Sequence, residues 1–380
     1  MNITIPDSVT EIGFYAFGGC TSLTNITIPD SVTRISESAF EGCTYLQKIK
    51  ASPENKFFII EDNVLYTKDK KKLVLCLNRT HFEIPNGVTE ISDYAFECCT
   101  SLANINIPNG VTKIGTAAFK GCTSLANINI PNGVTEIGTA AFKGCTSLAD
   151  ISIPDSVERI YDGVFSDCSA LNNIKVSPHN NYFITDDNVL YTKDKTTLIH
   201  CTNRTCFEIP NQATRISSYA FSDCNLLAEI KIPESMERIE DFAFSRCTSL
   251  TEIKIPKRVC HTGYGIFSLC SALNKIIVSL YNKYLTAENN VLYIKNKRKL
   301  LRCTNRTCFE IPNHVTDIDS YAFSGCNLLT NITIPNSVNY IGNNVFEGCT
   351  ALKTVIASRA TFNKFRRRFP SNVQWQELNP

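Results

Sequence analysis

The chain has 380 residues, with 38 Lys and Arg against 36 Asp and Glu, so its formal net charge is only +2. Positively and negatively charged residues alternate along the chain, which excludes the strongly basic surface expected of a nucleic-acid-binding protein. The small net charge also gives no overall electrostatic attraction to an anionic membrane. Because no run of about 18 apolar residues occurs, the sequence predicts no insertion into a membrane.

The chain opens with "MNITIPDSVTEIG", which is the middle of a repeat described below. No signal peptide precedes it. Repeat arrays normally begin with an atypical unit that covers the first open core, and that unit is absent here. We therefore expect an N-terminal portion of the protein to lie outside this sequence.

One pattern recurs from end to end of the chain. An Ile-Pro pair is followed by a Phe eleven residues after the proline and by a Cys three residues later, as in Pro131, Phe142 and Cys145. Most steps between successive copies are 23 residues, and three steps are longer by one unit of 33 residues. Eleven units of 23 residues and three of 33 account for nearly the whole chain, which predicts a single stacked array.

Each standard unit has the pattern of a strand, a corner and a compact return. In residues 23–45, Ile26 and Ile28 alternate with polar residues, as in a strand with one buried face. Pro29 ends the strand because it has no N–H to donate to a ladder. Phe40 and Cys43 then share one face at helical spacing. Because one unit cannot cover its own apolar side, successive units must stack.

The pattern L-x-x-I-x-I-P-x-x-V-x-x-I-x-x-x-A-F-x-x-C, complete at Leu125–Cys145, resembles the BspA-like, or treponemal-type, leucine-rich repeat. The resemblance implies a leucine-rich repeat solenoid with a parallel β-sheet on its concave face. Short helical or 3-10 turns and three β-hairpin insertions would lie on the convex or flank side. Relatives of this kind are surface proteins of mucosal bacteria and trichomonad-like protozoa, in which adhesion to host proteins, matrix or other cells is the usual activity.

The register predicts one solenoid domain over residues 1–357 and a C-terminal cap over residues 358–380. In the cap, Phe362, Phe365 and Phe369 recur at helical spacing. Each long unit contains two apolar runs around a polar turn, which predicts a β-hairpin. These hairpins are either structural variation or exposed binding epitopes. The long units lie near residues 52–84, 177–209 and 279–311.

Eighteen cysteines raise the question of disulfide bonds or a metal site. Eleven follow the repeat period, which indicates a buried column of small apolar side chains. Cys201 with Cys206, and Cys303 with Cys308, could each form a local bridge. A tetrahedral metal site would need four ligands at fixed spacing. We interpret these four cysteines and Cys76, the equivalent residue of the first long unit, as structural or incidental, and predict no metal and no cofactor.

Six sequons occur, and those at Asn78, Asn203 and Asn305 are the better glycosylation acceptors because they fall in predicted loops. Enzyme motifs are absent, and the five histidines occupy unrelated positions. The sequence therefore predicts no catalytic residues and a protein that is not an enzyme.

The polar residue between the two inward residues of each strand should project from the open face of the sheet. This surface is broad and polar, and it suits a protein or glycan ligand better than a small substrate. The prediction is a binding protein, a surface or secreted adhesin or antigen; the alternative is a cytoplasmic protein-interaction scaffold of the same fold. The ligand and the oligomeric state are left open. The residues predicted to contact the partner are Asn106, Asn129, Ser152, Lys175, Glu208, Lys231, Lys254 and Glu310.

Overall fold

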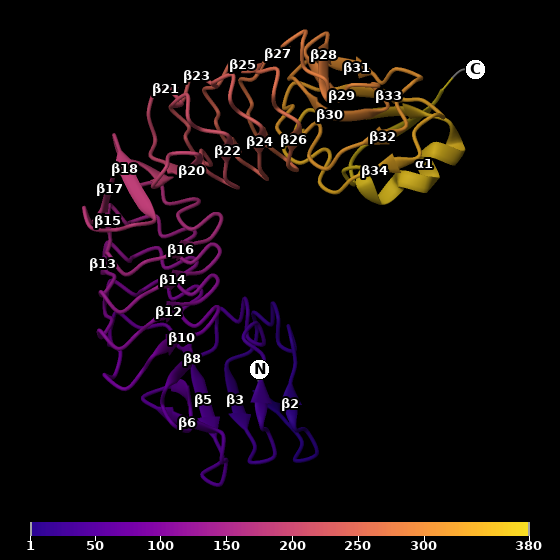
Figure 1. Ribbon diagram of the computed structural model, residues 1–380. Helices are drawn as coiled ribbons and strands as arrows, with labels where there is room; N and C mark the ends of the chain where they lie inside the picture. Colours follow the sequence, from indigo (N-terminus) through magenta and orange to yellow (C-terminus); the bar gives the residue numbers. More distant parts are fainter. Residues whose placement is uncertain (1, 379–380) are drawn as a thin grey trace. The chain divides into compact units, whose positions relative to one another are not determined.

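The computed structural model describes residues 2–378. The chain forms two compact units, Met1–Lys193 and Asp194–Pro380 (Figure 1). In each unit the chain coils into a parallel β-solenoid, which confirms the predicted fold class. The assignment of residues 1–357 to one solenoid domain remains a prediction.

A first row of strands forms where the sequence alternates Ile with polar residues. Successive strands pair in parallel with identical repeat positions aligned, so Ile151 lies opposite Ile174 and Ser152 opposite Lys175. In the first unit the strands are β1 (Asn2–Thr4), β3 (Asn25–Ile28), β5 (Lys48–Ala51), β9 (His81–Glu83), β11 (Asn104–Asn106), β13 (Asn127–Asn129), β15 (Asp150–Ile153) and β17 (Asn173–Val176). In the second unit they are β21 (Cys206–Glu208), β23 (Glu229–Lys231), β25 (Glu252–Ile255), β27 (Lys275–Val278), β31 (Cys308–Glu310), β33 (Asn331–Ile334) and β35 (Thr354–Ala357).

A second row of two-residue strands follows the proline corner, and the sequence analysis did not predict it. Ile114 pairs with Ile91 on one side and Ile137 on the other, and all three are fully buried. The first unit contains β2 (Glu11–Ile12), β4 (Arg34–Ile35), β10 (Glu90–Ile91), β12 (Lys113–Ile114), β14 (Glu136–Ile137) and β16 (Arg159–Ile160). The second contains β22 (Arg215–Ile216), β24 (Arg238–Ile239), β26 (His261–Thr262), β32 (Asp317–Ile318) and β34 (Tyr340–Ile341).

The return segments are chains of hydrogen-bonded turns, where the sequence analysis expected helical or 3-10 runs. Lys120 N donates to Ala117 O at 3.0 Å, a turn bond between residues three apart. Ala117 and Gly121 have left-handed backbone angles (φ 51° and 73°), which interrupt any helix. Their N–H groups instead donate to the next repeat, to Thr139 O at 2.8 Å and Lys143 O at 2.7 Å. The backbone polar groups of the turn are therefore satisfied by stacking.

The three long units contain the predicted hairpins, each with one further strand that the sequence analysis missed. In the first, the predicted strands are β7 (Val64–Thr67) and β8 (Lys72–Cys76), and the additional strand is β6 (Phe58–Glu61), antiparallel to β7. β8 then pairs in parallel with β10, so the hairpin rejoins the second row. The other strands are β18 (Phe183–Asp186), β19 (Val189–Thr192), β20 (Thr197–Cys201), β28 (Leu285–Glu288), β29 (Val291–Ile294) and β30 (Lys299–Cys303).

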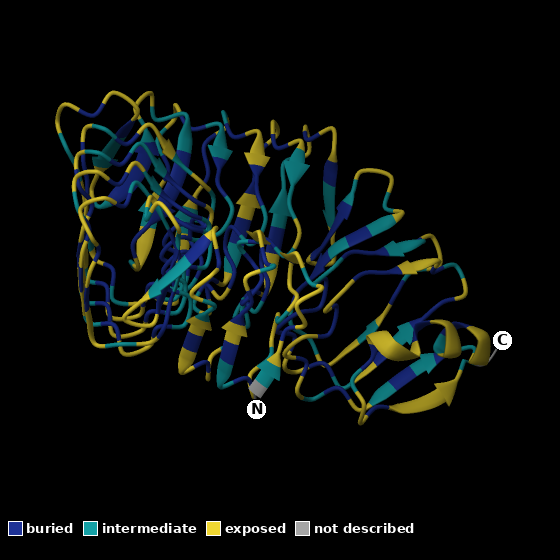
Figure 2. Ribbon diagram, turned by 90° about the horizontal axis from the view of Figure 1, so that it is seen from below, coloured by how far each residue is buried: buried dark blue, intermediate teal, exposed yellow. Residues whose placement is uncertain are grey.

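Stacked phenylalanines form the centre of each unit, as the repeat register predicts. In the first unit the rings of Phe96, Phe119, Phe142 and Phe165 are parallel, with centroids 5.0, 5.5 and 5.8 Å apart, and all four are fully buried. Buried residues line the inside of the coil and exposed residues its loops (Figure 2). Each turn thus supplies the apolar cover for its neighbour.

The thiol column includes members that the sequence analysis did not assign to it. Cys122 and Cys145 are fully buried, and their Sγ atoms donate to the carbonyl oxygens of Phe96 at 3.1 Å and Phe119 at 3.2 Å. In the long units Cys76, Cys201 and Cys303 are also buried, and Cys99 Sγ donates to Cys76 O at 3.5 Å. These three cysteines continue the column through the hairpins. All eighteen cysteines are free thiols, and Cys206 and Cys308 are exposed.

A buried asparagine fastens each hairpin to the preceding turn. Asn180 Nδ2 donates to Pro154 O at 2.7 Å and Val157 O at 3.0 Å, while its Oδ1 accepts from the N–H groups of Tyr182 and Phe183, both at 2.8 Å. Asn55 and Asn282 make the same four bonds in the other two long units. We call this arrangement the asparagine clasp. It fixes the path of the chain as it leaves the first row.

The C-terminal segment packs on the last turn, as predicted for a cap. It consists of α1 (Arg359–Phe365), η1 (Arg366–Arg368) and β36 (Gln374–Glu377), which pairs in parallel with β35. Phe369 is buried between Phe346 of the last repeat and Phe362, with ring centroids 5.8 and 5.5 Å away. These rings close the apolar core of the second unit.

Candidate partner-binding surface

The exposed side chains of the first-row strands form a polar surface, which we call the strand face. It contains all eight residues predicted to contact a partner, and all eight are exposed. Asn106, Asn129, Ser152 and Lys175 belong to the first unit, and Ser152 lies between Asn129 and Lys175 in the strand register. The second unit carries Glu208, Lys231, Lys254 and Glu310.

On the first unit the strand face offers uncommitted hydrogen-bonding groups. Within residues 2–378 no hydrogen bond or ion pair involves the side chains of Asn104, Asn106, Asn127, Asn129, Ser152 and Lys175, which we call the amide patch. Each carboxamide presents two donors and one acceptor to solvent, and strands in a parallel sheet repeat them about every 4.8 Å. The amide patch can therefore contact an extended polar ligand at several points.

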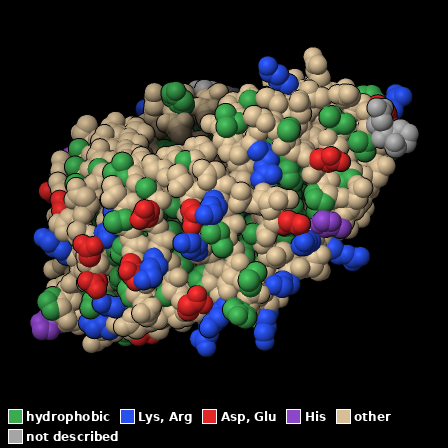
Figure 3. Space-filling view, turned by 90° about the horizontal axis from the view of Figure 1, so that it is seen from above, with side chains coloured by type: hydrophobic (Ala, Val, Ile, Leu, Met, Phe, Trp, Pro, Cys, Tyr) green, Lys and Arg blue, Asp and Glu red, His purple; other side chains and the backbone are tan. Residues whose placement is uncertain are grey.

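On the second unit, neighbouring charges of the strand face neutralise one another. Lys231 Nζ pairs with Glu208 Oε1, and Glu252 accepts from Lys275 at 2.8 Å and Lys254 at 3.3 Å. The hydrogen bond from Lys275 is the main cause that lowers the pKa of Glu252, with a smaller contribution from Lys254. Figure 3 shows acidic and basic side chains interspersed over the face seen from above. A partner here would have to displace existing ion pairs.

An open depression of about 330 Å³ lies on the strand face where β1, β3 and β5 run. It is lined by the polar side chains of Thr4, Thr27 and Asn25 and by Lys48 and Lys50. Neither lysine has an acidic partner in the described part of the chain. The depression is shallow and polar, so it extends the strand face and does not form a substrate pocket.

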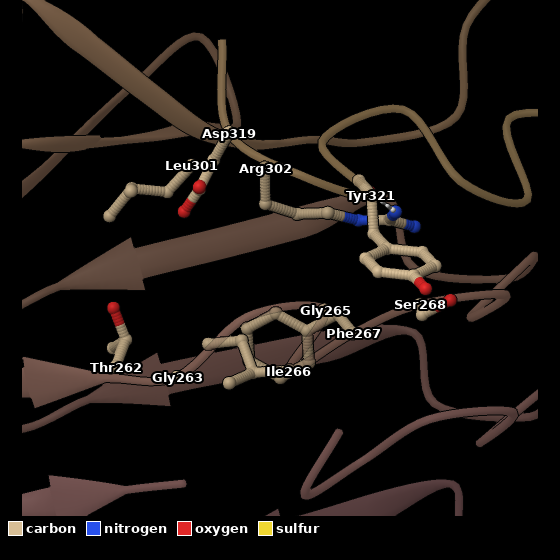
Figure 4. Close-up of a pocket in the computed structure, with 10 residues that line it drawn as sticks. All are labelled: Thr262, Gly263, Gly265, Ile266, Phe267, Ser268, Leu301, Arg302, Asp319 and Tyr321. Carbon is tan, nitrogen blue, oxygen red and sulfur yellow. Dashed lines mark hydrogen bonds between the residues drawn. The ribbon is translucent and has the colours of Figure 1, made fainter. Parts of the chain in front are cut away.

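An enclosed cavity in the second unit is much smaller, at about 10 Å³, the size of one water molecule (Figure 4). Arg302 and Asp319 lie on one side of it and Thr262 on the other. Arg302 is 2% exposed and donates to Ser324 O at 2.5 Å, so it is held by backbone. Such a cavity is a packing gap and cannot admit an organic substrate.

Comparison with known proteins now identifies the repeat. A model of the BspA type leucine rich repeat region matches six copies over residues 1–75, 69–197, 193–296 and 294–374. The chain belongs to the BspA-type leucine-rich repeat family. No curated protein matches it. This confirms the family that the sequence pattern resembles, and the family is one of protein-binding repeats.

Solved structures of leucine-rich repeat proteins resemble this BspA-type chain. One from Eubacterium ventriosum has a TM-score of 0.52 and 22% identity, over 78% of this chain and 83% of that one, and supports the fold. A leucine rich cell surface protein from Faecalibacterium prausnitzii gives 0.45 and 28% over 95% and 89%. The pneumococcal vaccine antigen PcpA gives 0.43 and 16% over 100% and 89%.

Titratable groups in this BspA-type array are explained by packing. Burial raises the pKa of the Cys145 thiol to about 12, which keeps it neutral and unreactive. Burial lowers the pKa of His200 to about 4. Burial, followed by a hydrogen bond with Glu37, raises the pKa of Asp93 to about 6. Residues 2–378 contain no group of three or more His, Cys, Asp or Glu side chains that could hold a metal.

The three favoured sequon asparagines have structural bonds that the sequence did not reveal. Asn78 and Asn203 are exposed, and each Oδ1 accepts a backbone N–H from the next repeat, Ser101 at 2.9 Å and Leu226 at 3.1 Å. Asn305 is half-buried and its Nδ2 donates both hydrogens, to Ser271 O at 3.1 Å and Asn327 Oδ1 at 2.7 Å. Glycosylation of Asn305 would remove one of these bonds. Modification of all three sites stays a prediction.

Proposed function

We propose that this BspA-type protein is a non-enzymatic adhesin or antigen that binds a protein or glycan at a cell surface through its strand face. The observation that carries the proposal is the amide patch of the first unit. Its side chains are exposed, regularly spaced and free of internal partners, so binding requires no break of existing bonds. The hairpin loops would supplement these contacts, as polar loops on a rigid frame often do.

Placement at the surface is part of the proposal. The F. prausnitzii protein is described as a cell surface protein, and the repeat resembles those of surface adhesins. No helix among residues 2–378 has the length and apolar character needed to cross a membrane.

Alanine substitution of the amide patch tests the proposal. The double variant Asn106→Ala/Asn129→Ala removes four donors and two acceptors from the middle of the surface. Matched control substitutions are Asn109→Ala and Asn132→Ala, since both residues are exposed on the corners of the same repeats. Binding would be measured by surface plasmon resonance against immobilised matrix glycoproteins and a glycan array.

A ligand of the amide patch should bind the double variant at least about tenfold more weakly, because each lost polar contact contributes roughly 1 kcal/mol. The control variants should retain wild-type affinity. Equal binding by both variants would refute a role for the amide patch. Charge reversal at Lys231 and Lys254 applies the same test to the second unit, where existing ion pairs lead us to expect a smaller loss.

The free thiols favour a second candidate, a cytoplasmic interaction scaffold. All eighteen cysteines are unbridged, a state natural to a reducing compartment. Labelling of intact cells with an impermeant amine reagent distinguishes the two. Labelled protein supports the surface proposal, whereas labelling only after lysis supports the scaffold.

A further inference from the structure

The third long unit differs from the other two at the loop that follows its first-row strand. Between β27 and β28, Leu280, Tyr281 and Tyr284 are 93%, 82% and 53% exposed. The first two of these positions are occupied by Pro53 and Glu54 in the first long unit. In the second long unit they are Pro178 and His179. Large apolar side chains at these two positions are thus placed in water only in the third copy, whereas the position of Tyr284 is an exposed aromatic in all three, with Phe57 47% and Tyr182 45% exposed.

The backbone of the loop is the same in all three copies, so the difference lies in the side chains alone. The asparagine clasp is present in each copy with bond lengths that agree to about a tenth of an ångström. Ser279 N donates to Ile255 O at 2.9 Å, and the equivalent serines of the other two copies make the same bond. Leu280 and Tyr281 are therefore held outward by a rigid loop.

The corner that precedes this loop, residues 256–259, is bonded to it by the clasp and differs in charge from the equivalent corners of the first two long units. Asn282 binds the carbonyl oxygens of Pro256 and Val259, so the residues between them, Lys257 and Arg258, lie beside Leu280 and Tyr281. Both are exposed, as is Lys283. In the corresponding corners the first two long units have Asp-Ser pairs, Asp30-Ser31 and Asp155-Ser156.

These basic side chains have no acidic partner among residues 2–378. Glu234 is the acidic residue at the equivalent corner one turn earlier, beyond Lys257, and it forms no ion pair with the cluster. By contrast, Lys254 and Lys275 in the adjoining strands both pair with Glu252. The cluster therefore keeps an uncompensated positive charge in a chain that is nearly neutral overall.

We propose that Lys257, Arg258, Leu280, Tyr281, Lys283 and Tyr284, the rim patch, dock the protein on the headgroup layer of an anionic lipid bilayer. Leu and Tyr on a protruding loop can enter the headgroup region, and the adjacent cations contact lipid phosphates and carboxylates. Leu280 and Tyr281 are 93% and 82% exposed, and such protruding side chains can enter a fluid headgroup layer that has no complementary pocket. A bilayer therefore fits the rim patch better than a folded partner does.

The repeats supply substitutions that are compatible with the backbone. Leu280→Pro/Tyr281→Glu recreates the loop of the first long unit, and Lys257→Asp/Arg258→Ser recreates the corner that precedes it. The assay is co-sedimentation with phosphatidylcholine vesicles with and without phosphatidylserine, at low and high salt. In a separate variant, Tyr281→Trp reports entry into the headgroup layer by a blue shift of its fluorescence.

The wild-type chain should bind phosphatidylserine vesicles, release them at high salt and ignore pure phosphatidylcholine. Each cation contributes about fivefold to the partition coefficient; the corner variant loses two cations and gains a carboxylate, so it should bind at least about 25-fold more weakly. The loop variant should also bind more weakly at low salt, where the wild-type chain is bound. Its circular dichroism melt should match that of the wild type, which separates lost docking from lost folding.

The reverse graft provides an independent arm. The starting protein combines the corner and loop substitutions in one chain and so lacks the rim patch. Adding Asp30→Lys, Pro53→Leu and Glu54→Tyr to it should restore salt-dependent vesicle binding through the first unit. The proposal is overturned if wild-type protein fails to sediment with anionic vesicles at low salt. It is also overturned if the corner variant and the loop variant both bind these vesicles as well as the wild type does. Capture of an acidic protein by the rim patch without vesicle binding would equally overturn it.

Discussion

The asparagine clasp gives a quantitative prediction for the stability of the first unit. Asn180 is fully buried, and replacing it with alanine removes the four hydrogen bonds of the clasp together with a longer, part-buried bond to Asp155 O at 3.4 Å. Two carbonyl oxygens and two N–H groups would be left without their side-chain partner. Each such group costs roughly 1 kcal/mol or more when buried. Pro154 O keeps a longer bond from Val157 N at 3.4 Å, which reduces the loss to about 3 kcal/mol in all.

The measurement is hydrogen exchange of the amides in β18 and β19 together with urea unfolding of the Asn180→Ala protein. Amides of both strands should exchange about a hundredfold faster or more, because 3 kcal/mol corresponds to that ratio. Asn129→Ala is the control, since that side chain is exposed and makes no bond among the described residues. A loss below about 1 kcal/mol for Asn180→Ala would refute the assignment of the clasp as the fastening of the hairpin.

Three further outcomes are expected. Phe142→Ala should lower the free energy of unfolding by about 3 to 5 kcal/mol in denaturant titration, because the ring is fully buried in a continuous stack; a loss near zero would contradict the stack. Asp93 has a folded pKa of about 6, above its unfolded value of 3.8, so its stabilising contribution is present below 3.8 and lost as pH rises through 6. Asp93→Asn should therefore raise stability at neutral pH by about 1 kcal/mol after allowance for solvent screening, with no gain below pH 3.8; thermal melts at both pH values check this. In a thiol titration with Ellman's reagent, the exposed Cys206, Cys260 and Cys308 should react in native protein, and most other thiols only after unfolding; rapid reaction of all eighteen would contradict burial of the column.

The repeat register predicted the core because burial imposes the same requirement on every turn. A side chain that faces inward, such as Phe142 or Ile151, has the same neighbours in each repeat, so its chemistry recurs at fixed spacing. The same argument predicted exposure of the polar strand residues, and Asn129 and Lys231 are indeed exposed. The repeat period predicts that these strand residues are exposed, but it does not predict affinity for a partner. Their role in binding therefore stays a prediction.

Local backbone geometry could not be predicted in the same way. Apolar spacing around Phe119 is compatible with a helix, but left-handed Ala117 interrupts it and the N–H groups bond to the next turn. Only a stacked neighbour makes that conformation favourable, and a single repeat gives no sign of it. Asn180 did leave a signal, because Asn55 and Asn282 occupy the same place in the other long units. The recurrence of this asparagine in all three copies is the signal that could have found the clasp, although recurrence alone does not establish burial, since Asn63 and Asn290 also recur and are exposed.

The backbone bonds between neighbouring turns have an evolutionary implication. Strand rows and return segments alike link one coil to the next through main-chain atoms, as Ala117 N does with Thr139 O in a return segment. Such connections do not depend on which side chains a copy carries, so a recombination event that adds or deletes one full period leaves two surfaces that still match. The near-identical neighbours at residues 108–130 and 131–153 are what a recent duplication would leave behind. One recombination event can therefore lengthen or shorten the solenoid by a full turn, and the product of each event can still fold.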